Sequence, residues 1–178
     1  KTTAGWSDFT AVPFTSQSFI ANEPTLVHSG AGQLELAATD VKLNLVYGHW
    51  RDEAWGNFMT ISPSQSSPPS KGFIGKPATV SSAPGQVEMV AQGLEGNLWF
   101  FQRWNGNWFV PYPVPAASTK ALVSPFRDPA TVLVGNKLTI VFVDGKGQLG
   151  AIAFDLETNI WGQPTVIPTK EPIQFAPA

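Results

Sequence analysis

The sequence lacks cysteine altogether, and it is poor in charged residues and in long apolar runs. Without cysteine the chain has no disulfide, no thiolate metal site and no cysteine nucleophile. Charged residues make up only 13% and the formal net charge is -2, so the basic character of a nucleic-acid-binding protein is missing. No apolar run approaches the roughly 18 residues of a membrane-spanning helix, which predicts no membrane span.

What the chain has is aromatic residues and an internal repeat. It contains 12 phenylalanines and seven tryptophans against two methionines, a β-rich profile. Four tryptophans each stand six residues before a β-branched residue: Trp6, Trp55, Trp108 and Trp161. Their shared register predicts that they pack between blades and that Trp55, Trp108 and Trp161 are largely buried. A second series places a valine three residues after Pro24, Pro77 and Pro129. The period of about 52 residues is close to the ~40–50 residues of a β-propeller blade.

Each repeat contains four β-like runs and no helical periodicity. In the second repeat these runs cover residues 77–83, 86–92, 97–103 and 108–114. Asn105-Gly106 separates the last two runs and favours a type I′ hairpin turn, which needs a positive φ at both central residues. Four short strands cannot bury both faces of their own sheet, whereas blades stacked radially cover one another.

We therefore predict an all-β fold in which residues 1–178 form a single β-propeller segment of about three and a half four-stranded antiparallel blades. Residues 6–12 are expected as the outer strand of a preceding blade and residues 172–178 as the start of the next one. The three blades between them are expected at residues 24–61, 77–114 and 129–167. An open stack leaves two apolar faces in water. We therefore expect other polypeptide to complete the ring, either a second chain from a nicked precursor, a region outside this sequence or another copy of the chain.

The second repeat carries a family resemblance. The string from Gly85 to Trp99, followed by Arg103-Trp-Asn-Gly-Asn-Trp108, resembles the repeats of fucose-binding β-propeller lectins. The bacterial seven-bladed lectins of the Photorhabdus type are the better match, and the six-bladed fungal fucose lectins a looser one. The first and third repeats have Val46 and Gly150 where the second has Trp99. The resemblance implies a propeller that binds glycans, fucosylated ones among them.

A saccharide site needs an aromatic face and a few fixed polar groups. The third run of each repeat and the turn after it supply both. The candidate ligand-binding residues are Trp99, Arg103, Trp104 and Asn105 in the second repeat, and His49, Trp50, Arg51 and Glu53 in the first. The repeats align Trp50 with Arg103 and Arg51 with Trp104, so each site is expected to hold a neighbouring Trp–Arg pair. For Trp99, in the middle of a strand, a place in the core is an equal alternative.

Catalysis has little support in the sequence. His28 and His49 are the two histidines, and the neighbours His28 and Ser29 would point to opposite faces of a strand. The carboxylates of Asp52 and Glu53 fall in a turn, where solvated charge is the usual explanation. We therefore predict a secreted or extracellular, non-enzymatic lectin without catalytic residues, metal or cofactor. Two alternatives stay open, namely a propeller that binds or scaffolds other proteins, and part of a propeller glycoside hydrolase whose carboxylates lie elsewhere.

Overall fold

The computed structural model describes residues 12, 19–115 and 127–171 of the chain. Strands dominate these residues, and η1 (Pro63–Gln65) is a single 3-10 turn between two of the sheets. No helix in the described part of the chain is long and apolar enough to cross a membrane. The expected outer strand at residues 6–12, apart from residue 12, and the expected strand start at residues 172–178 lie outside the described residues.

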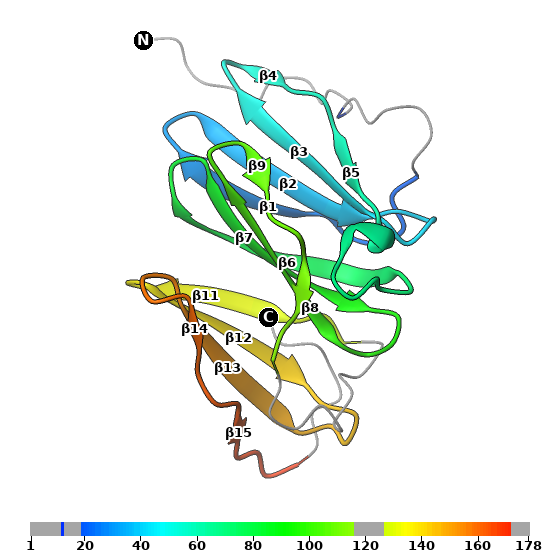
Figure 1. Ribbon diagram of the computed structural model, residues 1–178, viewed down its shortest axis with the longest axis vertical. Coiled ribbons are helices and arrows are strands. Elements are labelled where there is room, and N and C mark those ends of the chain that lie inside the picture. The colour runs from blue at the N-terminus through cyan, green and yellow to red at the C-terminus, as the bar shows by residue number, and fades with distance from the viewer. Residues whose placement is uncertain (1–11, 13–18, 116–126, 172–178) are drawn as a thin grey trace, which may run out of the picture.

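The strands form three antiparallel sheets that follow one another along the chain and are stacked in space (Figure 1). The first contains β1 (Thr25–Gly30), β2 (Gln33–Thr39), β3 (Leu45–Arg51), β4 (Ala54–Trp55) and β5 (Met59–Ile61). The second contains β6 (Phe73–Ala83), β7 (Gln86–Gly93), β8 (Leu98–Trp104), β9 (Asn107–Trp108) and β10 (Tyr112–Pro113). The third contains β11 (Ala130–Val134), β12 (Lys137–Val143), β13 (Leu149–Asp155), β14 (Ile160–Trp161) and β15 (Thr165–Ile167).

The outermost strand of every sheet is split into two short pieces. The sequence predicted one continuous strand there, because the residues form an unbroken β-like run. Both pieces pair with the third strand of their sheet. At each break the same backbone hydrogen bond forms, from Gly56 N–H to the His49 carbonyl at 2.8 Å in the first sheet and from Gly162 N–H to the Ala153 carbonyl at 2.8 Å in the third. The split strand counts as one, so the predicted fold of four-stranded antiparallel propeller blades is confirmed.

The first strand of each sheet lies nearest the axis around which the blades are arranged. β6 packs between β1 and β11, and the hydroxyls of Thr25 and Thr79 are 2.9 Å apart. Pro77 was expected as the first residue of its strand, but β6 begins four residues earlier, at Phe73. The pairing of β6 with β7 shifts register between Ile74 and Ala78, and an irregularity of this kind tolerates a proline that cannot donate to the ladder.

Two apolar layers hold the three blades together. One lies between the first and second blades and the other between the second and third. Their largest fully buried side chains include Phe73, Trp99, Phe100, Phe101 and Phe154. The recurring Trp55, Trp108 and Trp161, expected to be largely buried, are only half-buried. Trp108 and Trp161 pack at the edges of these layers, whereas Trp55 lies on the outer face of the first blade against Trp50 and Phe58. Trp108 and Trp161 therefore border the blade interfaces, and aromatic and aliphatic side chains together fill the centres of the interfaces.

Candidate functional site

A buried carboxylate lies between the first and second blades. Glu35, on β2, is only 1% exposed. The Ser29 hydroxyl donates to its Oε1 at 2.7 Å, and the Tyr47 hydroxyl donates to its Oε2. A buried charge is costly unless it is paired and hydrogen-bonded, and these donors provide part of that compensation.

Two of the three arginines in the sequence approach this carboxylate from different blades. Arg51, the last residue of β3, places Nη2 3.5 Å from Glu35 Oε1. Arg103, on β8 of the second blade, places Nη1 4.0 Å from the same oxygen. The Arg103 side chain is 7% exposed and that of Arg51 is 35% exposed. Two guanidinium groups and one carboxylate give the group a net charge of one positive unit. The Arg51 side chain is the part of it that reaches solvent.

Aromatic rings border the charged groups. The Arg103 guanidinium carbon lies 5.3 Å from the centre of the Tyr47 ring, and Trp108 meets that ring edge-on at 4.9 Å. Trp108 also lines a pocket of about 160 Å³ between the outer strands of the two blades. The other residues of this pocket are Met59, Thr60, Ile61, Gln65, Phe109, Val110 and Pro111. Trp108 therefore contacts Tyr47 beside the charged groups and also lines an apolar pocket.

We call this group of side chains the Glu35 cluster. Its members are Ser29, Glu35, Tyr47, Arg51, Arg103 and Trp108. Several of its N–H donors are buried and have no acceptor among the described residues: Arg51 Nε, Arg103 Nε and Nη1, and Trp108 Nε1. Buried donors without acceptors are rare because each costs about 1–3 kcal/mol. A ligand rich in oxygen would satisfy them.

The protonation states within the cluster follow from burial. Burial and the hydrogen bond to Glu35 both raise the pKa of Tyr47 above its ordinary value, so its hydroxyl stays a donor. Burial and the neighbouring Arg51 lower the pKa of His49, which lies beside the cluster. At neutral pH the Tyr47 and His49 side chains are therefore both uncharged.

The expected Trp–Arg pairs do not form single sites, because neighbouring residues of a strand point to opposite faces of the sheet. Arg51 faces the second blade, whereas Trp50 lies on the other face and packs against Trp55 at 5.7 Å. Arg103 faces the first blade, whereas Trp104 lies on the face toward the third blade and is 52% exposed. The structure instead brings together one arginine from each pair.

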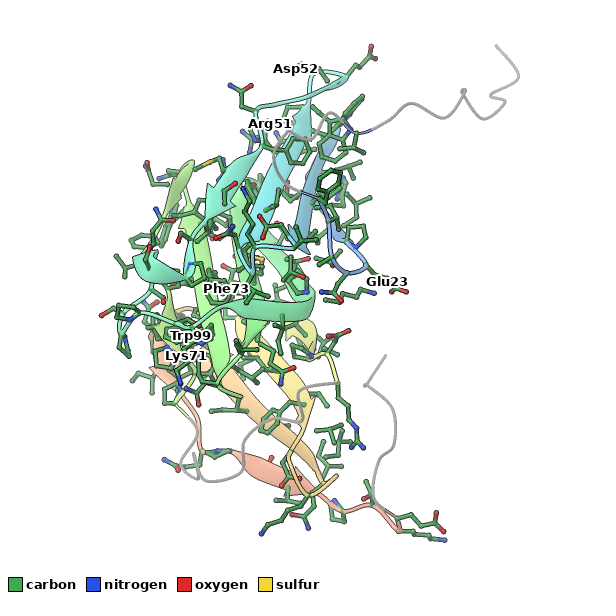
Figure 2. The ribbon with its side chains drawn as sticks, turned by 90° about the vertical axis from the view of Figure 1, so that its right-hand side faces the viewer. Glu23, Arg51, Asp52, Lys71, Phe73 and Trp99 are labelled. Atoms are coloured by element: carbon green, nitrogen blue, oxygen red, sulfur yellow. The ribbon has the colours of Figure 1, made fainter. Side chains whose placement is uncertain are left out.

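Of the remaining expected site residues, Trp99, Glu53 and Asn105 lie away from this meeting point, whereas His49 lies beside it, opposite Glu35 in the strand pairing. Trp99 is 1% exposed, packs against Phe73 at 6.2 Å and donates from Nε1 to Glu95 at 2.9 Å, so it occupies the core (Figure 2). Glu53 and Asn105 stand in exposed turns with φ of 61° and 50°. His49 lies close enough to Arg51 for its pKa to respond. Figure 2 shows Arg51 at the end of β3, beside the turn that contains Asp52.

The interface between the second and third blades repeats the carboxylate without the arginines. Glu88 takes the place of Glu35, and Ser82 donates to its Oε1 at 2.8 Å. Phe154 occupies the register position of Arg103, and Phe100 that of Tyr47. The ring centres of Phe100 and Phe154 lie 5.0 Å apart. This interface is therefore apolar around one buried carboxyl group.

We expect Glu88→Gln to raise the free energy of unfolding at pH 7. Burial raises the pKa of the Glu88 carboxyl above its ordinary 4.5, although hydrogen bonds from Ser82 oppose this in part. The stability that Glu88 contributes is therefore present below pH 4.5 and is lost as the pH rises through the raised pKa. Urea unfolding at pH 4 and pH 7 should show a gain at the higher pH that shrinks at the lower one. The exposed Glu53→Gln is the control, and an equal effect of Glu88→Gln at both pH values would contradict the assignment.

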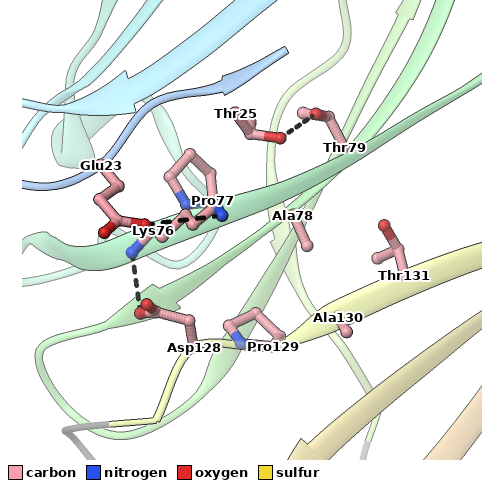
Figure 3. A pocket seen from close by; sticks show the side chains of 10 residues that line it. All are labelled: Glu23, Thr25, Lys76, Pro77, Ala78, Thr79, Asp128, Pro129, Ala130 and Thr131. Carbon is pink, nitrogen blue, oxygen red and sulfur yellow. Dashed lines mark hydrogen bonds and ion pairs between the residues drawn. The ribbon is translucent and has the colours of Figure 1, made fainter. Parts of the chain in front are cut away.

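A second hollow, of about 330 Å³, lies where the first strands of the three blades begin (Figure 3). Glu23, Lys76 and Asp128 supply its charges. Lys76 Nζ lies 3.8 Å from Glu23 Oε2, and the Lys76 backbone N–H donates to Asp128 Oδ1 at 2.8 Å. In a propeller this position faces the central channel. No group of three potential metal-ligating side chains occurs among residues 12, 19–115 and 127–171.

Sequence reasoning missed Glu35 and Ser29, and it assigned Trp108 to packing alone. A signal for Glu35 was present, because a glutamate interrupts an otherwise apolar run at the same register position in two repeats, at Glu35 and Glu88. A charge at a core-facing strand position indicates a buried polar network. The convergence of Arg51 and Arg103 on Glu35 had no comparable signal, since it depends on which faces of two blades meet.

Known structures show the same architecture. The BP39L lectin from Burkholderia pseudomallei is similar with a TM-score of 0.64 and 20% identity, over 81% of this chain and 41% of that lectin. A fungal lectin with a six-bladed β-propeller fold, Aleuria aurantia lectin, is similar with a TM-score of 0.57 and 12% identity, over 83% of this chain and 45% of its own. The SapL1 lectin, solved with α-methyl fucoside, gives a TM-score of 0.54 and 11% identity, over 87% of this chain and 49% of its own.

These likenesses establish the fold, and they confirm the resemblance to fucose-binding β-propeller lectins at the level of architecture. The chain spans about half the length of the lectins it matches, or slightly less. No protein-family model and no curated protein matches the sequence.

Proposed function

We propose that this chain is a carbohydrate-binding, lectin-like module that holds a saccharide at the Glu35 cluster. The observation that carries the proposal is the set of buried N–H donors on Arg51, Arg103 and Trp108 that lack acceptors. Saccharides present many oxygens, and an aromatic ring beside polar groups is the usual combination that holds them. The likeness in fold to a lectin described with a fucose recognition mode and to one solved with a fucoside supports the same class of ligand.

The proposal is for binding without catalysis. A glycoside hydrolase of the usual kind needs two carboxyl groups on either side of the scissile bond. Within the described residues, Glu35 is the one buried carboxylate in the cluster, and its two oxygens already accept from Ser29 and Tyr47. Glu88 belongs to the next blade interface. These contacts among the described residues support the proposal of recognition without hydrolysis.

The first experiment combines a glycan array with titration of selected saccharides. A single saccharide is expected to bind with a dissociation constant between millimolar and tens of micromolar, because it offers few contacts. Arg51→Gln and Trp108→Phe should each weaken binding by at least about tenfold while the thermal unfolding midpoint stays near that of the wild type. Trp50→Phe and Trp104→Phe lie on other faces and serve as matched controls. Loss of binding in these controls alone would place the site on those faces instead.

We also propose that other polypeptide completes the propeller ring. On the first blade, Leu26 lies on the face away from the second blade and is 56% exposed. On the third blade, Val132 and Val134 lie on the outward face and are 50% and 71% exposed. Exposed apolar surface of this kind marks an interaction site. Native mass spectrometry on the 178-residue chain tests the source, because a dimer indicates closure by a second copy and a monomer indicates closure by other sequence.

A further inference from the structure

We infer that the Glu35 cluster selects an acidic saccharide, one that carries a carboxylate or sulfate group, over its neutral counterpart. The inference rests on the proposed function and adds the class of ligand to it. Its basis is a mismatch within the cluster, where the groups that lack partners are all hydrogen-bond donors and the net charge is positive.

The unpaired N–H donors of the cluster favour a ligand that supplies acceptors. Arg51 Nε, Arg103 Nε and Nη1, and Trp108 Nε1 are buried and lack acceptors among the described residues. Glu35, the one carboxylate of the cluster, already receives the Ser29 hydroxyl at Oε1 and the Tyr47 hydroxyl at Oε2, so fewer acceptors than donors remain for a ligand. A sugar hydroxyl both donates and accepts, so a purely neutral sugar would leave its own donors poorly matched. A carboxylate or sulfate group accepts only, as this site requires.

The net positive charge of the cluster favours an anionic ligand. Arg51 and Arg103 flank the same oxygen of Glu35, at 3.5 Å and 4.0 Å, so one carboxylate faces two cations. Tyr47 is protonated and His49 is neutral at pH 7, since their pKa values are raised and lowered respectively. The acidic side chains of the adjoining turn, Asp52 and Glu53, are exposed to solvent and therefore screened. An anion bound against the guanidinium groups, beside Glu35, would supply the missing negative charge.

The geometry of arginine favours the same ligand. A guanidinium group presents its donors in a planar fork that matches a carboxylate or sulfate group, and such charge-assisted bonds are roughly twice as strong as neutral ones. The interface between the second and third blades offers an internal comparison. It keeps a carboxyl group in Glu88 but has Phe154 and Trp104 at the register positions of Arg103 and Arg51. The propeller therefore holds one anion-selective interface beside one that is not.

The test uses saccharide pairs that differ only in the acidic group. Methyl galactoside is compared with the methyl glycoside of galacturonic acid, which has a free carboxylate, and with 3-O-sulfo methyl galactoside. Isothermal titration at 0.02 M and 0.15 M salt is expected to show the acidic member of a pair binding at least about tenfold more tightly. The preference should fall as the salt concentration rises. The carboxylate and sulfate members distinguish the two acidic groups.

Three variants locate the effect. Arg51→Gln, at a partly exposed position, and Arg103→Gln should each lower the affinity for the acidic saccharide to that for its neutral partner. Lys146→Gln removes one exposed positive charge from the third blade and should change nothing. If Arg103→Gln unfolds, Arg51→Gln alone decides the outcome.

The alternative outcomes separate this inference from the proposed function. Equal binding of acidic and neutral saccharides, sensitive to Arg51→Gln, would overturn the acidic preference and leave the lectin proposal standing. Acidic binding that is insensitive to both arginine variants would also overturn it, because the charge effect would then come from elsewhere. Absence of binding by any saccharide to the folded chain would reject both.

Discussion

Replacing Phe100 by alanine is expected to lower the free energy of unfolding by about 3–5 kcal/mol, as for other buried phenylalanines. The Phe100 side chain is fully buried on β8, between the second and third blades. Its ring centre lies 5.0 Å from that of Phe154 and 5.2 Å from that of Trp161. The aromatic rings around it come from both blades and cannot close the space left by a benzyl group. The lost contacts therefore weaken the interface between two blades.

Urea unfolding followed by tryptophan fluorescence measures this effect. With a urea dependence of about 2 kcal/mol per molar, the unfolding midpoint should fall by roughly 2 M. A domain at the lower end of the ordinary stability range of about 5–15 kcal/mol would be close to unfolded at 37 °C. Phe109→Ala, in the same blade but 54% exposed, is the control and should change stability by less than about 0.5 kcal/mol. Similar midpoints for the two variants would show that the blades do not depend on this aromatic layer.

Replacing Glu35 by glutamine is expected to destabilise the chain by roughly 3 kcal/mol, because it breaks a buried pair and keeps the cation. The Arg103 side chain is 7% exposed and lies 4.0 Å from Glu35 Oε1. Without the carboxylate its charge would have no counter-ion within the cluster. The interface between the second and third blades has no cation at this position, since Phe154 occupies the register position of Arg103 there.

A double-mutant cycle tests this interaction. Glu35→Gln, Arg103→Met and the combined variant are compared in urea at pH 7. The combined variant should be more stable than the sum of the single effects implies, by about 0.5–3 kcal/mol, because it leaves no isolated charge. Strict additivity would show that the two side chains do not interact and that Arg103 is held by other groups.

The blades could be predicted from the sequence because their signals are local and repeated. A proline precedes or interrupts the first strand, a glycine turn follows it, and a tryptophan stands in the fourth strand, at Pro77, Gly85 and Trp108 in the second blade. The break in the outer strand escaped prediction because residues on both sides of it have high β propensity. A backbone hydrogen bond such as that from Gly56 to His49 leaves no trace in composition.

The candidate site was predicted only in part. Arg51 and Arg103 were identified, but each was paired with the wrong neighbour because adjacent strand residues were treated as sharing a face. Alternation along β3 and β8 would have separated Trp50 from Arg51 and Arg103 from Trp104. Even so, the meeting of the two arginines at Glu35 depends on how one blade packs on the next. That packing joins residues about 50 to 70 positions apart in the sequence, and local patterns do not specify such contacts.

The central claim is that a saccharide binds between the first and second blades at the Glu35 cluster. Its most direct test follows the indole N–H resonances of the seven tryptophans in a ¹⁵N-labelled chain during saccharide titration. Trp108→Phe and Trp161→Phe assign the two resonances that matter. The expected result is a saturable shift of the Trp108 resonance, whose Nε1 belongs to the cluster, with Trp161 unchanged in the second interface. A shift confined to the other tryptophan resonances, with Trp108 unmoved, would contradict the claim.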